Sequence, residues 1–467
     1  MDYILKLFKW QNMINASEIK GDIPSNRKIY KRTFDIAWPS ALESVLIALI
    51  GAVDMMMVGS LGKEAINAVG ITNQPKFIVL APIMAINVGL TVLVSRRKGE
   101  QKPEEANSYL RNALVMSILL SFVLSVSAWV FARPFLIFAG ANADYIDLAV
   151  KYFRIIMVGN FFYSIGLTMT AAQRGAGNTK ISMLTNLVAN LVNLVFNALL
   201  INGLFFFPRL EVVGAAIATA MGNVVAFIMA SYSLSHKNRY LYLKVRYLFK
   251  TQKKYFKDIL NISKSSLIEQ IFLRMGFFMY AKSIAILGTV AFAAHQVCMN
   301  VMHISFGFGD GLQIANTSLV GQSLGARRPD MAKIYSRVTQ RIGIVVAIIL
   351  ALICFGFKDQ LIGLFTNDIE VITAGALPMM FLSIIILFQV PQVIIVGALR
   401  GAGDVKFVAF LMLISVTFVR PLLAWVLCYP LGFGLVGAWI ALLIDQLTRS
   451  VISSRRFKQG KWSSIVV

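Results

Sequence analysis

Charged residues are scarce in this 467-residue chain and make up 14% of it, against roughly 25% in an average soluble domain. This scarcity excludes a string of ordinary soluble domains, although the length alone would accommodate two or three of them. Acidic residues are the fewest, with 22 against 45 basic ones and a net charge of +23. The basic residues stand in short segments between apolar runs, a distribution typical of membrane proteins, so they do not indicate a nucleic-acid partner.

Cysteine and histidine are also rare, with three residues of each. Cys298, Cys354 and Cys428 lie inside apolar runs, and their odd number and placement exclude a disulfide framework. His295 and His303 lack the spacing of metal ligands, so we expect both to pack in the interior with hydrogen-bond partners. Catalytic and nucleotide-binding motifs are absent as well, so we expect no enzyme activity, no metal and no cofactor.

Long apolar runs are what the sequence has instead, and 57% of its residues are hydrophobic. A membrane-spanning helix needs about 20 mostly apolar residues, and backbone groups in lipid must be satisfied internally. We therefore predict an all-α integral membrane protein with twelve transmembrane helices. They are expected over residues 33–58, 68–94, 110–138, 148–172, 181–205, 214–234, 255–287, 290–319, 342–364, 375–398, 407–429 and 434–452.

Basic residues in the connections predict the orientation. They concentrate between the second and third, sixth and seventh, and eighth and ninth helices, and in the tail. Such connections face the cytoplasm, which places both termini on the cytoplasmic side of the inner (plasma) membrane. Residues 1–10 do not have the pattern of a cleaved signal. They form either a short amphipathic helix on the membrane surface or part of a disordered basic tail that extends to about Tyr30.

An internal repeat organises the chain. The segment RGAG at residues 174–177 recurs at residues 400–403, 226 positions later, and several loop residues follow the same offset. We predict two six-helix bundles related by a pseudo-twofold axis along the membrane normal, with the binding site between them near the midplane. The expected parts are a cytoplasmic N-terminal segment (1–32), an N-terminal lobe (33–235), a cytoplasmic linker (236–254), a C-terminal lobe (255–453) and a cytoplasmic tail (454–467). In both RGAG segments, glycine is expected to supply a positive φ that ends one helix before the next begins.

Ionisable side chains at membrane depth are candidates for function because burying them is unfavourable. Asp54 ranks first, since it stands among apolar residues near the end of the first predicted helix. A carboxylate in a partly dry cavity can bind a proton or Na⁺. Asn193 and Asn197, four residues apart on one helix face, could complete a cation site or join neighbouring helices. The alternative for Asp54 is a solvated residue at the end of its helix.

A second set of polar residues falls in the C-terminal half. Glu269 and Arg274 are five positions apart on one helix, so they point in different directions and are not expected to pair. Asp310 stands between two glycines and could line a cavity, and Arg420 is expected to pair with an acidic residue such as Asp445. Lys76 and Arg449 belong to a group of charges that we expect to reach the membrane interface.

These residues together resemble the multidrug and toxic compound extrusion (MATE) family over nearly the whole chain. The resemblance rests on Pro39 with VDMMMVGSLG and AINAVG, on NLVFNALLINGLF and VGQSLGARRPDMA, on the paired RGAGN and RGAGD turns, and on RPLLAW and GLVGAWIA. It implies two six-helix bundles around a V-shaped cavity, alternating access, and antiport of a drug against a cation.

The resemblance also assigns expected roles. Asp54 matches the family's carboxylate in the first helix, and Asn193 and Asn197 match an asparagine–aspartate pair, although the second position is an amide here. Glu269 lies near a family glutamate. The tenth helix has no acidic residue before Asp404 and offers Gln389 and Gln392 instead, which weakens a cation site in the C-terminal half. A carboxylate with amide neighbours favours H⁺ over Na⁺ as the coupling ion.

We therefore expect a monomer in the lipid bilayer that exports small amphipathic or cationic organic molecules. Asp54, Asn193 and Asn197 are its expected cation-coupling residues. The expected substrate-cavity residues are Glu269, Arg274, Asp310, Gln389 and Gln392. The alternatives are a flippase for a lipid-linked saccharide, which Arg274 favours because such a cavity is more basic, an integral membrane enzyme, and a channel.

Overall fold

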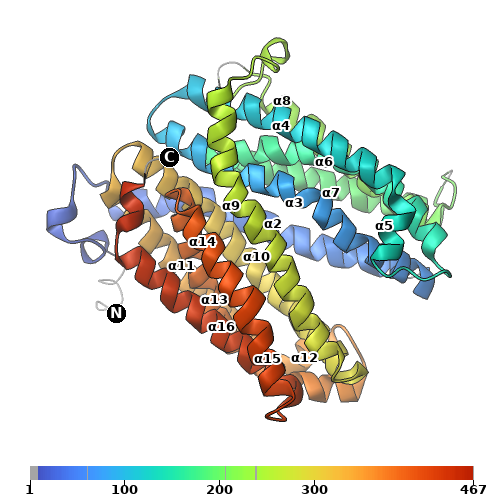
Figure 1. Cartoon of the computed structure of the whole chain (residues 1–467). Coiled ribbons are helices and arrows are strands. Elements are labelled where there is room, and N and C mark those ends of the chain that lie inside the picture. Colours follow the sequence, from blue (N-terminus) through green and yellow to red (C-terminus); the bar gives the residue numbers. More distant parts are fainter. Residues whose placement is uncertain (1–8, 60, 206, 237–238, 466–467) are drawn as a thin grey trace. The chain divides into compact units, whose positions relative to one another are not determined.

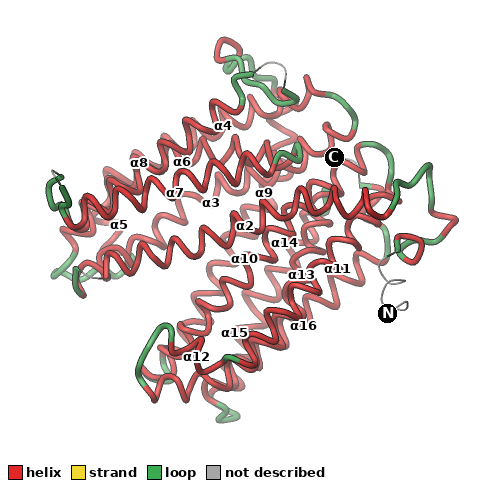
Figure 2. Tube along the Cα trace, turned by 180° about the vertical axis from the view of Figure 1, so that it is seen from behind, coloured by secondary structure: helices red, strands yellow, loops and turns green. Residues whose placement is uncertain are grey.

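The computed structural model describes residues 9–59, 61–205, 207–236 and 239–465. Within these ranges the chain forms helices joined by short connections, and no strand occurs (Figure 2). The predicted all-α class is confirmed. Ten helical segments of the described chain are long and apolar enough to cross a membrane. Helix α9 (Lys253–Ala285) and helix α10 (Thr289–Gly325), of 33 and 37 residues, have the length to cross a membrane but are not among these ten.

Contacts between helices divide the chain into two compact units (Figure 1). The first unit is Val45–Leu267, and the second combines Met1–Ser44 with Ile268–Val467. Both boundaries fall inside a helix, one in α2 (Asn26–Gly59) and the other in α9. The lobe limits expected from the sequence, at 33–235 and 255–453, stay a prediction.

The first unit is built around α6 (Ile146–Gly175), which packs against α3 (Lys63–Gly99), α4 (Pro103–Val130) and α8 (Glu211–Ser233). The short α5 (Ala132–Phe138) follows α4, and α7 (Thr179–Asn202) packs against α8. Small residues let these helices approach closely. A Cβ atom on Gly159 would lie 2.7 Å from the Ala220 backbone, and one on Gly222 would lie 2.7 Å from the Ala189 carbonyl.

The second unit is built around α13 (Ile369–Gly401), which packs against α10, α11 (Pro329–Gly356) and α16 (Gly434–Lys458). The short α12 (Lys358–Gly363) follows α11. One continuous helical segment combines α14 (Val405–Met412), the π-helix η4 (Leu413–Val419) and α15 (Arg420–Cys428). Short 3₁₀ turns complete the described chain, at η1 (Trp10–Asn12), η2 (Ala16–Glu18), η3 (Val245–Tyr247) and η5 (Lys461–Ser464).

The two units repeat the same order of elements at the offset seen in the sequence. Helices α3 and α10 begin after Gly62 and Gly288, whose φ angles are 107° and 110°. Helices α4 and α11 begin at Pro103 and Pro329, and have 28 residues each. In the two RGAG turns, Gly177 and Gly403 have φ angles of 87° and 92°, as predicted. The repeat differs at η4, because its counterpart α7 is α-helical throughout.

The N-terminal segment packs against the rest of its unit. The Lys20 amide donates to Asp330 Oδ2 at 3.1 Å, and Arg328 donates to the carbonyls of Gly21 and Asp22 at 3.2 and 3.0 Å. Met13 is buried. The expectation of a disordered tail up to about Tyr30 is therefore wrong for residues 9–30, because backbone contacts and an apolar anchor hold this segment. The amphipathic helix expected over residues 1–10 lies almost entirely outside the described residues.

Candidate functional site

Asp54 lies in the last part of α2, five residues before the helix ends at Gly59. Its side chain is only partly buried. Apolar residues from the neighbouring helices pack together at this end of the unit, among them Val58, Ile201 and Val212. Asp54 therefore stands near an apolar cluster, with its side chain partly exposed.

The structure brings Asp54, Asn193 and Asn197 together as predicted. Asn197 Nδ2 donates to Asp54 Oδ1 at 2.7 Å, and the same nitrogen lies 3.5 Å from Asn193 Oδ1. Asn193 Nδ2 in turn donates to Thr219 Oγ1 on α8 at 3.1 Å. Asn197 Oδ1 is buried and has no hydrogen-bond partner among the described residues. The carboxylate of α2 is thus held by one amide of α7, which α8 supports.

Lys76 on α3 belongs to the surroundings of Asp54. The sequence did not predict that these two residues lie near each other. Its ammonium lies within electrostatic range of the Asp54 carboxylate, and Tyr152 on α6 does as well. The grouping of Lys76 with side chains that simply reach the interface is therefore incomplete. One signal was present in the sequence, because Lys76 is the only charged residue between Glu64 and Arg96.

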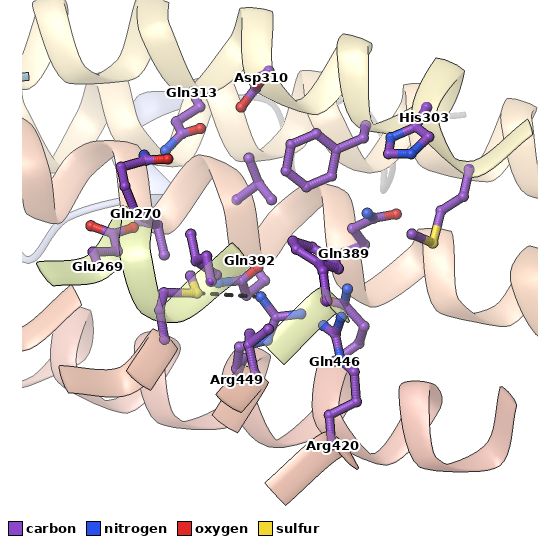
Figure 3. A pocket seen from close by; sticks show the side chains of 18 of the residues that line it. Glu269, Gln270, His303, Asp310, Gln313, Gln389, Gln392, Arg420, Gln446 and Arg449 are labelled. Carbon is purple, nitrogen blue, oxygen red and sulfur yellow. Dashed lines mark hydrogen bonds between the residues drawn. The ribbon is translucent and has the colours of Figure 1, made fainter. Parts of the chain in front are cut away.

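A second candidate site is a cavity of about 370 Å³ inside the second unit, called the C-terminal unit from here on because Ile268–Val467 form most of it (Figure 3). It is lined by all five residues expected to form a substrate cavity: Glu269, Arg274, Asp310, Gln389 and Gln392. In Figure 3, Asp310, Gln313 and His303 from α10 face the cavity from one side, and Arg420, Gln446 and Arg449 lie on the opposite side. The volume is in the range of small-molecule sites.

The charged side chains around this cavity are paired in two groups. Glu269 is buried and forms an ion pair with Arg400 of the RGAG turn, not with Arg274. Asp445 is fully buried between two guanidinium groups, with Arg420 Nη2 at 2.5 Å and Arg449 Nη2 at 2.8 Å. The expected partner of Arg420 is confirmed. The interfacial role expected for Arg449 is wrong, since its side chain is 6% exposed and bonds to Asp445.

The π-helix η4 shapes this wall of the cavity. Ser415, within η4, donates to Asp445 Oδ1, and Arg420 directly follows η4. Helix α9 lies directly against the η4 backbone, because a Cβ on Gly276 would meet the Val416 carbonyl oxygen at 2.3 Å. Thr417 also donates to the Phe272 carbonyl at 2.8 Å. π-Helical segments are rare and frequently mark functional sites.

His295 and the three cysteines have packing roles. His295 is buried among the rings of Tyr280, Phe292 and Trp439. Its Nδ1 atom has no hydrogen-bond partner among the described residues, so the packing role is confirmed without the expected hydrogen bond. Cys298, Cys354 and Cys428 are buried free thiols, as expected. His303 lines the cavity instead of the core.

Comparison with known proteins adds independent findings on the family. The family model MatE matches residues 39–199 and 266–426, one stretch in each half. The chain is 27% identical to the "Probable multidrug resistance protein NorM" of Thermotoga maritima, over 96% of each chain. It is 26% identical to the "Uncharacterized transporter YisQ" of Bacillus subtilis, over 92% of this chain and 94% of that one.

Solved structures show the same fold. A MATE transporter crystallised in complex with MaL6 superposes with a TM-score of 0.86 at 20% identity, covering 93% of this chain and 97% of that one. A MOP superfamily transporter from Pyrococcus furiosus, described as having a binding pocket of reverse polarity, gives 0.85 at 21% identity, with 94% and 97% covered. These matches support twelve transmembrane helices in two bundles. The chain belongs to the MatE family, the multidrug and toxic compound extrusion transporters, and is a transporter and not an enzyme.

Proposed function

We propose that this protein exports small amphipathic or cationic organic molecules in exchange for protons, with Asp54 as the coupling carboxylate. The observation that carries the proposal is the contact between Asp54 and Asn197 beside an apolar cluster. A carboxylate in such a place gains stability when a cation binds it, because its charge is otherwise poorly solvated. Relatives that are named multidrug resistance proteins support the class of substrate.

The surroundings of Asp54 favour a proton over Na⁺. The nearest amide of Asn197 presents its NH₂ group to the carboxylate, and Lys76 adds a positive charge within electrostatic range. Both groups compete with a metal cation, which needs several oxygen ligands and is repelled by an ammonium. A proton needs only the carboxylate oxygen itself.

In this mechanism the proton shifts an equilibrium between two conformations of the transporter. It can do so only by the difference in its affinity for the two states. Protonation removes the charge of Asp54 and weakens the hydrogen bond from Asn197, which loosens the attachment of α2 to α7. We place both termini in the cytoplasm and the protein in the inner membrane, on the basis of the basic connections.

The test is export of a lipophilic cationic dye from proteoliposomes, with wild type and Asp54→Asn compared under a pH gradient and under a Na⁺ gradient. We expect the pH gradient to drive export by wild type and Asp54→Asn to abolish it. If the Asp54→Asn variant is folded and exports the dye equally well under the pH gradient and under the Na⁺ gradient, the proposed role of Asp54 is ruled out.

A flippase for a lipid-linked saccharide is the second candidate, and the cavity of the C-terminal unit is the observation that favours it. Four arginines line this cavity, Arg274, Arg400, Arg420 and Arg449, and guanidinium groups bind the anionic group of such a lipid. The same proteoliposomes test it with a fluorescent lipid-linked saccharide. Protein-dependent movement of this lipid between leaflets, without dye export, would favour the flippase.

A further inference from the structure

We propose that the cavity in the C-terminal unit binds the carboxylate of a small, singly charged aromatic acid. This inference concerns a site for an organic anion, whereas the proposed function concerns cationic substrates and a coupling carboxylate in the other unit. It does not depend on the role of Asp54, because every residue that lines the cavity belongs to the C-terminal unit.

The charged side chains in and directly behind the cavity lining include one more positive group than negative groups. Four arginines line it, together with the acidic residues Glu269 and Asp310. Asp445, which bonds to two of these arginines, lies behind them and is fully buried. Arg420 and Arg449 therefore share a single carboxylate, although the side chains of both are at least 93% buried. A buried positive charge without a full counter-charge is unfavourable in a membrane protein, and a monovalent anion would balance it.

Buried amides beside these arginines supply unused hydrogen-bonding groups. Gln389 and Gln392 on α13 are 1% and 0% exposed, and neither side-chain nitrogen nor oxygen has a hydrogen-bond partner among the described residues. Arg449 Nε also has none. Buried polar groups are nearly always satisfied, by protein, water or ligand. In Figure 3, Gln389 and Gln392 lie between the α10 side chains on one side and Arg420, Gln446 and Arg449 on the other. Guanidinium and amide N–H groups that lie close together can donate hydrogen bonds to both oxygens of a carboxylate.

The rest of the lining points to an organic body on the anion. Phe277, Phe306, Val393, Val396 and Met412 form apolar and aromatic walls, which suit an aromatic ring. A cavity of about 370 Å³ is much larger than a chloride ion needs. A phosphate dianion would leave one excess negative charge in an apolar setting, whereas a carboxylate neutralises the single excess positive charge.

The experiment uses the purified full-length protein in detergent and chloride-free buffer. Binding of 2-naphthoate is measured by isothermal titration calorimetry and by the rise in melting temperature, because a ligand of the native state stabilises it. We expect saturable binding, with 2-naphthamide, inorganic phosphate and chloride each at least tenfold weaker. Equal binding of the naphthamide, or of either inorganic ion, would overturn the proposal.

Two sets of variants locate the site. Arg449→Met leaves the Arg420–Asp445 pair neutral, so the variant should fold while its affinity for 2-naphthoate falls at least tenfold. Gln389→Leu and Gln392→Leu do not touch the ion pairs, and each should weaken binding severalfold. The matched control is Arg455→Met, on the exposed face of the same helix, which should bind as wild type does. Unchanged binding in Arg449→Met and both leucine variants would overturn the assignment.

The same preparation separates this inference from the proposed function. Asp54→Asn should bind 2-naphthoate with unchanged affinity. If wild type exports the cationic dye but does not bind 2-naphthoate, this inference fails alone. If it binds 2-naphthoate but exports no dye under either gradient, the proposed function fails alone.

Discussion

Asn197 Nδ2 lies 2.7 Å from Asp54 Oδ1 and ties the end of α2 to α7. The 226-residue repeat places Tyr280 at the position equivalent to Asp54. The Tyr280 hydroxyl donates to the Ala438 carbonyl at 2.8 Å and is buried. The two units thus use equivalent positions differently: one has a partly exposed, ionisable carboxylate, and the other has a buried hydroxyl in a neutral hydrogen bond.

Asn197→Leu tests the hydrogen bond to Asp54. The variant removes a donor that stabilises the ionised carboxylate, and a hydrogen bond to a charged group contributes about 1.5–3 kcal/mol. We therefore expect the pH at which dye export is half-maximal to rise by about one unit. Asn202→Leu, one turn further along α7 and near the surface, is the control and should keep the wild-type pH profile. Identical profiles for both variants would contradict a functional contact.

Lys76→Gln tests the preference for protons. Without the ammonium near Asp54, the repulsion of other cations is weaker. We expect the variant to show dye export driven by a Na⁺ gradient, which wild type lacks, while proton-driven export falls. The control is Lys151→Gln, because Lys151 is exposed on α6. Strong Na⁺-driven export by wild type, unchanged in Lys76→Gln, would show that Lys76 does not select the ion.

A feature of this site can be predicted from the sequence when it depends only on residues that are close together in the chain. A polar residue inside an apolar run can be recognised from the sequence alone. This is why the sequence predicted Asp54, Asn193 and Asn197 as site residues. The helices and both RGAG turns were predictable for the same reason, since apolar run length and glycine φ preference are local properties.

The positions of Lys76 and Arg449 depended on which side of a helix faces a neighbour. Arg449 contacts Asp445 one turn away, yet the sequence alone does not show that both are turned inward with Arg420. The π-helix η4 was equally hidden, because its counterpart α7 has the same apolar character and remains α-helical. Such features arise from packing between distant segments, such as Gly276 against Val416.

Gly276→Ala tests the close approach of α9 to η4. A Cβ there would lie 2.3 Å from the Val416 carbonyl oxygen, so one backbone must move. We expect a loss of roughly 1–3 kcal/mol of stability, the usual effect of overpacking, seen as a lower melting temperature. Gly356→Ala is the control, because nothing lies within 4 Å of its Cβ position. A melting temperature for Gly276→Ala equal to that of the control would mean that the two segments separate easily.

Glu100 lies in the connection between α3 and α4, and we expect its ionisation to make the stability of the protein depend on pH. Burial raises its pKa, but the guanidinium of Arg97 and the ammonium of Lys102 outweigh this and hold the pKa below the ordinary value for glutamate. The stabilisation is therefore present above the ordinary pKa and is lost as the pH falls through the lowered one. We expect Glu100→Gln to reduce the melting temperature by about 1–2 °C at pH 7.5.

The difference between Glu100→Gln and wild type should shrink as the pH is lowered below about 4.5. Glu64→Gln, at an exposed position in the first turn of α3, serves as the control for loss of a surface charge. A difference that stays constant across this pH range would indicate that Glu100 acts through packing and not through its charge.

Asp445→Asn tests the buried carboxylate that two arginines share. Removing its charge leaves Arg420 and Arg449 buried without a counter-ion, and breaking a buried pair in this way destabilises a protein by about 3–5 kcal/mol. We expect a melting temperature lower by about 3–5 °C and poor recovery from the membrane. Arg449→Met should lose much less, since the remaining Arg420–Asp445 pair is neutral. Asp144→Asn, at an exposed site, controls for the chemistry of the substitution. If Asp445→Asn and Asp144→Asn melt together, the cluster tolerates two uncompensated charges and the reason for placing an anion in the cavity disappears.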